Sequence, residues 1–267
     1  MSICASVLGV TMVLRRMSMI GDGLAHAGFG ALAVATLLDA TGDYKMEISI
    51  PIVMAASLLL MYISERGVGG DAAIAVVSTG MMTLGVLIFS FTTGYTADMC
   101  SSLFGSASIL TVTNGELVLS LVLAAVVIII FMLFYHKIFA VTFDESFAAA
   151  TGIHTALYKV ILSLLISVTV VVGMNLIGSV MISALIVFPA LTAMKVSKSF
   201  GHVIAFATVM SVLCFVVGFV VSAELSLPVG ASVVAVDIIV YAATAALTAV
   251  KNSRELHRAR DLNESHS

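Results

Sequence analysis

Long apolar runs separated by short polar breaks dominate this chain of 267 residues. A helix needs about 20 apolar residues to cross the hydrocarbon core of a bilayer, and most of the runs reach or approach that length. The pattern therefore predicts an all-α fold, a polytopic transmembrane helical bundle of about eight or nine spans. The runs lie near residues 1–14, 20–40, 48–63, 71–93, 117–135, 156–173, 176–194, 203–223 and 228–250.

Two segments depart from this pattern. The first run has only 14 residues before Arg15, fewer than a spanning helix requires. We expect either a short first helix or, in preference, a natural chain that begins further upstream. The stretch 94–116 is too polar to span, so it is expected to be an outer loop or a short re-entrant element packed against protein.

Composition excludes several classes of protein. Hydrophobic residues make up 61% of the chain and charged residues 10%, with a mean hydropathy of +1.18, whereas a soluble domain carries about 25% charged residues. The net charge of −3 provides no dense basic face for a nucleic acid. The sequence has no G-x-x-x-x-G-K-[ST] motif for ATP, and its three scattered cysteines form no C-x-x-C pair. We therefore expect a protein of the lipid bilayer that is not itself an enzyme.

The distribution of Lys and Arg predicts the orientation. If Arg15 and Arg16 lie in the cytoplasm, eleven of the twelve cationic residues fall on the cytoplasmic side and only Lys45 lies outside. This assignment gives a transmembrane domain over residues 1–250 and a polar cytoplasmic tail over residues 251–267. The outer segments carry six acidic residues. These residues either form a negatively charged entrance that attracts cations or have no functional meaning, because Asp and Glu do not follow the positive-inside rule.

Asp22 and His26 are the first candidate metal ligands. They are four residues apart, so a helix places them on one face. A carboxylate beside an imidazole suits divalent ions such as Zn²⁺ or Mn²⁺. In the alternative interpretation, Asp22 favours the N-terminal end of its helix and His26 bonds a neighbouring carbonyl group. The spacing alone leaves both interpretations open.

Two further acids are candidates by position. Glu224 lies at the predicted outer end of a span, where it could receive a metal ion or simply be solvated. Asp237 lies near the middle of the last span, where a carboxylate costs about 2.5–3.5 kcal/mol unless it is paired or faces water. It could serve transport or could be a protonated group hydrogen-bonded between helices.

The segment 137–154 is a predicted cytoplasmic insertion with a short helix at about 142–153. Asp144 and Glu145 lie at its start and Gly152 near its end, as the polarity of a helix prefers. Such a helix could dock a soluble partner or could be a capped loop.

Five sequence motifs occur in a fixed order along the chain. The motifs are R-R-M-S-x-x-G-D-x-L-A-H-A, the L-F-G of residues 103–105, T-F-D-E-x-F-A-x-x-x-G, G-x-x-x-I-S-x-L-I-x-F-P-A and P-x-G-A-S-V-V. Together they resemble the metal-cation family of ABC permeases, which import zinc, manganese or iron, and the resemblance covers nearly the whole chain. The motif G-D-x-L-A-H-A favours the zinc-importing members.

This resemblance implies a permease subunit in the cytoplasmic membrane of a bacterium. It implies a homodimer that works with a cytoplasmic ABC ATPase subunit and an extracytoplasmic metal-binding protein. ATP would then bind the partner subunit, this chain would hold no cofactor, and the transported ion would be a divalent metal, zinc in preference. Asp22 and His26 become residues of the metal path or gate.

The resemblance also implies that the string T-F-D-E-x-F-A-x-x-x-G docks on the ATPase. The residues carried over to that role are Phe143, Asp144, Glu145, Phe147 and Gly152.

Two alternatives stay open. The permease could import manganese or iron instead of zinc, because a separate binding protein largely sets selectivity. The chain could also be a secondary cation transporter coupled to protons through His26 and Asp237. The segment 137–154 separates these classes, because a secondary transporter needs no docking helix.

Overall fold

The computed structural model describes residues 1–15, 18–38, 45–65, 70–92, 103–104, 114–197 and 199–264. All nine apolar runs fall on helices, as expected in lipid, where each backbone N–H and C=O group must be satisfied within its own segment. The all-α prediction is confirmed. The helices are α1 (Ser2–Leu14), α2 (Ser18–Leu38), α3 (Lys45–Glu65), α4 (Gly70–Thr92), α6 (Asn114–Leu133), α7 (Tyr135–Phe143), α8 (Glu145–Ala150), α9 (Thr155–Ile177), α10 (Ser179–Val196), α11 (Phe200–Leu225) and α12 (Val229–Glu264).

Among these helices, seven are long and apolar enough to cross a membrane. The count becomes eight if α6 and α7, which meet at a bend of 68°, form one span. Helix α1 is apolar but has only 13 residues. The expectation of eight or nine spans is consistent with this arrangement, and the chain is a multi-pass membrane protein. The polar stretch 94–116, expected to be an outer loop or a re-entrant element, lies largely outside the described residues.

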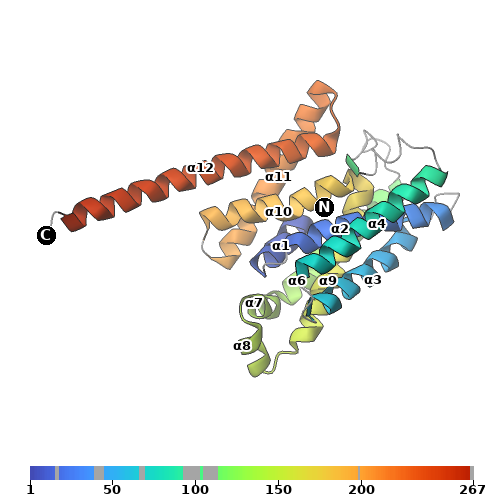
Figure 1. Ribbon diagram of the computed structural model, residues 1–267, viewed down its shortest axis with the longest axis horizontal. Coiled ribbons are helices and arrows are strands. Elements are labelled where there is room, and N and C mark those ends of the chain that lie inside the picture. Colours follow the sequence, from blue (N-terminus) through green and yellow to red (C-terminus); the bar gives the residue numbers. More distant parts are fainter. Residues whose placement is uncertain are drawn as a thin grey trace.

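Helices α2, α9 and α10 form the centre of the bundle. In their apolar windows 67%, 67% and 56% of the residues are buried, against 11% in α12. Helix α1 lies beside them, and its residues from Cys4 to Val13 are all buried (Figure 1). The exposed side chains of α3, α4, α6, α11 and α12 are mostly apolar, which suits contact with lipid. Short α1 is thus a core helix of the bundle.

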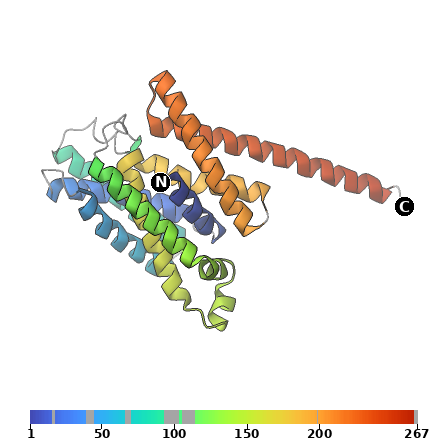
Figure 2. The same ribbon diagram turned by 180° about the vertical axis from the view of Figure 1, so that it is seen from behind.

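The two ends of the bundle differ. Both views place α7 and α8 together at one end and the turn between α11 and α12 at the other (Figures 1 and 2). Helix α12 leaves the bundle and continues to Glu264, past the end of its apolar run, so the polar tail predicted from residue 251 begins as a helix (Figure 2).

The backbones of α1 and α10 approach each other closely at Gly9. A Cβ atom on Gly9 would collide with the backbone carbonyl group of Ile186 in α10. Ile186 is 1% exposed, so this contact lies within the core. A residue without a side chain is required at such a helix crossing, as is common between transmembrane helices.

Candidate functional site

Asp22 and His26 lie one turn apart on α2. The Nε2 atom of His26 is 3.6 Å from the Oδ2 atom of Asp22. The side chain of His26 is 23% exposed and that of Asp22 is 45% exposed, although α2 is one of the most buried spans. The i, i+4 spacing seen in the sequence thus brings the carboxylate and the imidazole together, with the carboxylate on the more open side.

The other ring nitrogen of His26 is buried. In the described part of the chain, no hydrogen-bond donor or acceptor reaches Nδ1. A buried polar atom without a partner costs about 1–3 kcal/mol. Such an atom is an unusual feature of a packed helix, so His26 is not accounted for by the alternative in which it bonds a neighbouring carbonyl group.

Small residues hold α2 tightly on both sides of the pair. Gly21 faces the Ile186 side chain of α10, and Gly23 faces the Ile74 side chain of α4. Side chains larger than hydrogen at these two glycines would press on those neighbours. Asp22 therefore lies on a helix that has little freedom to shift without moving α4 or α10.

Asp237 lies between α11 and α12. It is 2% exposed, and its side chain lies near that of Cys214 on α11, which is 3% exposed. The second carboxylate oxygen, Oδ2, is buried, and none of the described residues bonds it. The contact with Cys214 favours the interpretation in which Asp237 joins two helices.

Glu224 is exposed in the last turn of α11. The following turn is fixed by Ser226, which adopts a left-handed conformation at φ 52°, and by the Ser222 hydroxyl, which donates to the carbonyl oxygen of Leu227 over 2.6 Å. Glu224 therefore lies at the end of the bundle opposite to α7 and α8 (Figure 1).

The four candidate residues do not gather at one point within a single chain. Across the described ranges, no group of three or more His, Cys, Asp and Glu side chains could hold a metal ion. The structure brings Asp22 and His26 together and leaves Glu224 and Asp237 outside that pair. Each chain thus offers two adjacent donor groups rather than a closed four-ligand site.

The predicted docking helix consists of two helices that meet at Asp144. The sequence interpretation placed one short helix at about 142–153, whereas α7 ends at Phe143 and α8 begins at Glu145. Asp144 is extended, and its Oδ1 atom accepts a hydrogen bond of 2.8 Å from the backbone N–H of Phe147, which caps α8. Gly152 ends the segment at φ 84°, a left-handed conformation that favours glycine.

The α8 region combines one anchored face with one exposed aromatic face. Ala148 is fully buried and packs with Val141 of α7 and Tyr158 of α9. Phe143 and Phe147 are 58% and 64% exposed. The Phe143 ring also contacts the rings of Phe139 and Phe200. Large exposed aromatic side chains such as these are typical of protein interfaces.

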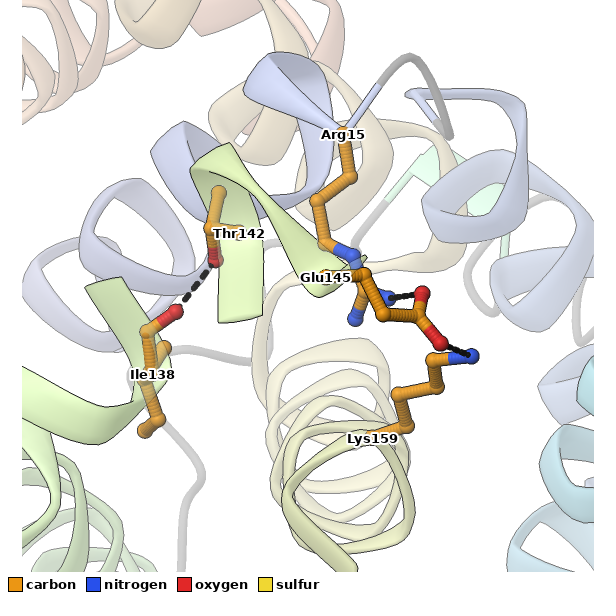
Figure 3. A network of polar contacts seen from close by, with 5 residues as sticks. All are labelled: Arg15, Ile138, Thr142, Glu145 and Lys159. Atoms are coloured by element: carbon orange, nitrogen blue, oxygen red, sulfur yellow. Dashed lines mark hydrogen bonds and ion pairs between the residues drawn. The ribbon is translucent and has the colours of Figure 1, made fainter. Parts of the chain in front are cut away.

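Glu145 points in another direction, toward the bundle. Its carboxylate lies 2.5 Å from Nζ of Lys159 on α9 and 3.8 Å from the guanidinium group of Arg15 at the end of α1 (Figure 3). Sequence reasoning did not identify Arg15 and Lys159 as partners of Glu145. The only signal in the sequence was that all three fall on the predicted cytoplasmic side.

The chain was compared with known proteins. The model of the ABC 3 transport family matches residues 1–248. A Thermotoga maritima protein described as a "probable metal transport system membrane protein" is 31% identical over 83% of this chain and 77% of its own length. A manganese transport system membrane protein of Listeria monocytogenes, MntC, is 26% identical over 90% of this chain and 84% of its own.

A solved structure shares the fold. The structure of PsaBC from Streptococcus pneumoniae in complex with a Fab superposes with a TM-score of 0.80, at 24% identity, over 91% of this chain and 86% of that one.

Proposed function

Since this chain belongs to the ABC 3 transport family, and thus resembles membrane components of metal transport systems over most of its length, we propose that it is the permease subunit of an ATP-driven importer of a divalent transition-metal ion. The observation that carries the proposal is the Asp22–His26 pair on a central helix. ATP hydrolysis takes place on a separate ATPase subunit, and the metal ion is the substrate that this chain conducts.

The Asp22–His26 pair supplies one oxygen and one nitrogen donor. The Nε2 atom of His26 and the half-exposed carboxylate of Asp22, 3.6 Å apart, suit an ion that binds briefly. A transport site must release its ion. It therefore has fewer ligands and a lower affinity for the ion than a structural zinc site. Two copies of the pair, one from each subunit of a homodimer, would give four donors around a shared path.

Zinc, manganese and iron are the candidate substrates, and zinc and manganese are the two with specific support. The sequence interpretation favoured zinc from the spelling of the α2 motif. Relatives named for manganese transport support manganese at least as well. The carboxylate oxygen of Asp22 suits Mn²⁺, and the imidazole nitrogen of His26 suits Zn²⁺. The pair can therefore accept either ion.

The cytoplasmic partner binds at α8 in this proposal. Phe143 and Phe147 provide the apolar contact, while the Asp144 cap and Gly152 fix the shape of the segment. The C-terminus lies on the same, cytoplasmic side, as the positive-inside distribution requires. Glu224, at the opposite end, receives the ion from an extracytoplasmic binding protein.

Asp237 takes no direct part in this path. It lies near Cys214 between α11 and α12, and its burial leaves it no open side. We assign it a role in packing and in keeping these two helices together.

A complementation experiment tests the function and separates the candidate ions. Bacteria that lack their own manganese and zinc importers would express this chain with its ATPase and binding protein, and growth in chelated medium would be scored after adding Mn²⁺, Zn²⁺ or Fe²⁺. Growth restored by one or more of these ions, and lost in Asp22→Asn, supports the proposal. If none of the three added ions restores growth in cells that express this chain, the result would contradict the proposal.

A further inference from the structure

Three charged side chains from separate elements meet beside α8. Glu145 comes from the first turn of α8, Arg15 from the end of α1 and Lys159 from the second turn of α9 (Figure 3). The two cations are 12% and 13% exposed, whereas the carboxylate is 46% exposed. Glu145 thus supplies a counter-charge to two largely buried cations.

The geometry of Glu145 differs from that of its aromatic neighbours. Phe143 and Phe147 are exposed to an incoming partner, but the Glu145 carboxylate is engaged with two helices of the bundle. A side chain held in this way can tie α8 to α1 and α9 even while the aromatic side chains bind another protein.

A chain of packed contacts runs from Arg15 to the metal pair. Arg15 ends α1, and its backbone N–H bonds the carbonyl oxygen of Thr11 over 3.2 Å. Further along α1, Gly9 meets the backbone of Ile186 in α10. The side chain of Ile186 in turn faces Gly21, the neighbour of Asp22. Because these contacts are buried and close, α1 and α10 cannot slide freely past α2.

We propose that Glu145 is a positioning residue that transmits movement of α8 to the metal pair, through Arg15, α1 and Ile186, rather than a contact to the ATPase. This inference rests on the proposed function, because it takes α8 as the element that the ATPase moves. Lys159 anchors the same carboxylate to α9, so α8 moves as one body with the cytoplasmic ends of two core helices. In this proposal Phe143 and Phe147 bind the ATPase subunit, and the Glu145 carboxylate links movement of α8 to α1 and α9.

The test uses the full complex of permease, ATPase subunit and binding protein in proteoliposomes. Two quantities are measured for each variant: Mn²⁺ or Zn²⁺ taken up per ATP hydrolysed, and ATPase subunit retained during purification. Glu145→Gln should lower uptake per ATP by about threefold to tenfold while retaining the full amount of ATPase subunit. The matched control is Ser146→Ala, an exposed position on the same helix, which should change neither quantity.

A double-mutant cycle tests the pairing. Arg15→Gln should reproduce the loss, Arg15→Lys should keep most of the coupling, and the double variant Glu145→Gln with Arg15→Gln should be no worse than the poorer single variant. If Glu145→Gln does not fold, the comparison of Arg15→Gln with Arg15→Lys tests the inference by itself: uptake per ATP should fall in the first variant and be mostly kept in the second.

Three results would overturn the inference. The first is loss of bound ATPase subunit in Glu145→Gln, which makes Glu145 a docking contact. The second is unchanged uptake per ATP in Glu145→Gln or in Arg15→Gln. The third is a double variant whose defect is the product of the two single defects. Wild-type complex without ATP-driven uptake would overturn the proposed function itself, and this inference with it.

Discussion

The Nε2 atom of His26 lies 3.6 Å from the Oδ2 atom of Asp22, and the opposite ring nitrogen of His26 has no partner among the described residues. The distance is too long for a strong hydrogen bond and short enough for both groups to reach one ion. The pair therefore places a carboxylate oxygen and an imidazole nitrogen side by side on a central helix, as the proposed metal path requires.

Replacement of either residue should lower metal uptake by living cells about tenfold or more, because loss of even a hydrogen-bonding partner of a metal ligand typically costs that much. Asp22→Asn keeps the size and removes the charge, and His26→Ala removes the imidazole. Uptake of radioactive Mn²⁺ and Zn²⁺ is the measurement, normalised to permease abundance in the membrane. His202→Ala, an exposed histidine on α11, is the matched control and should be neutral. Normal uptake in both α2 variants would reduce the pair to helix packing.

Phe147→Ala should weaken binding of the ATPase subunit by about tenfold, because a large exposed aromatic at an interface centre contributes more than 1 kcal/mol. The side chain is 64% exposed, so its loss should leave folding intact. Co-purification and titration of the ATPase subunit provide the measurement. The control is Leu225→Ala, which is 63% exposed at the other end of the bundle. Equal affinity for both variants would show that α8 is not the docking surface.

Gly9→Ala should destabilise the permease by about 1–3 kcal/mol, the usual cost of forcing atoms into a packed core. The new methyl group would overlap the Ile186 backbone, which cannot rotate away as a side chain can. Thermal unfolding in detergent measures the effect. Gly80→Ala is the control, because a Cβ atom there meets nothing within 4 Å, and it should be neutral or slightly stabilising. An unchanged Gly9→Ala protein would argue against the close α1–α10 crossing.

Single cysteines should label from opposite sides of the membrane at the two ends of the bundle. In a background without Cys4, Cys100 and Cys214, Ser146→Cys should react with an impermeant reagent only from the cytoplasm. Glu224→Cys should react only from outside. Both positions are exposed. External labelling at position 146 would invert the proposed orientation.

Local pattern was sufficient to predict the helices and the Asp22–His26 pair. Apolar runs reveal the membrane spans because a backbone in lipid must satisfy its hydrogen bonds within a helix. Residues four apart are neighbours on the surface of any helix, which reveals the pair. The bend between α6 and α7 was missed because apolar and aromatic residues continue through the change of direction. The break at Asp144 was missed because the polar residues there match the start of a single helix.

The Glu145 network was out of reach for a different reason. Its ion pairs join residues 15, 145 and 159, and no periodicity in one sequence reports contacts across such distances along the chain. The crossing of Gly9 with Ile186 is equally non-local. Prediction from one sequence therefore identified the α2 pair and the α8 segment but not the contacts that connect them.

Metal uptake into sealed proteoliposomes that contain the permease and its ATPase subunit tests the central claim most directly. With binding protein and Mn²⁺ or Zn²⁺ outside, uptake should require ATP in the compartment that holds the ATPase subunit and should continue when ionophores collapse every ion gradient. Asp22→Asn should reduce it about tenfold or more. Uptake that proceeds without ATP and follows an imposed proton gradient would contradict this account and would identify a secondary transporter instead.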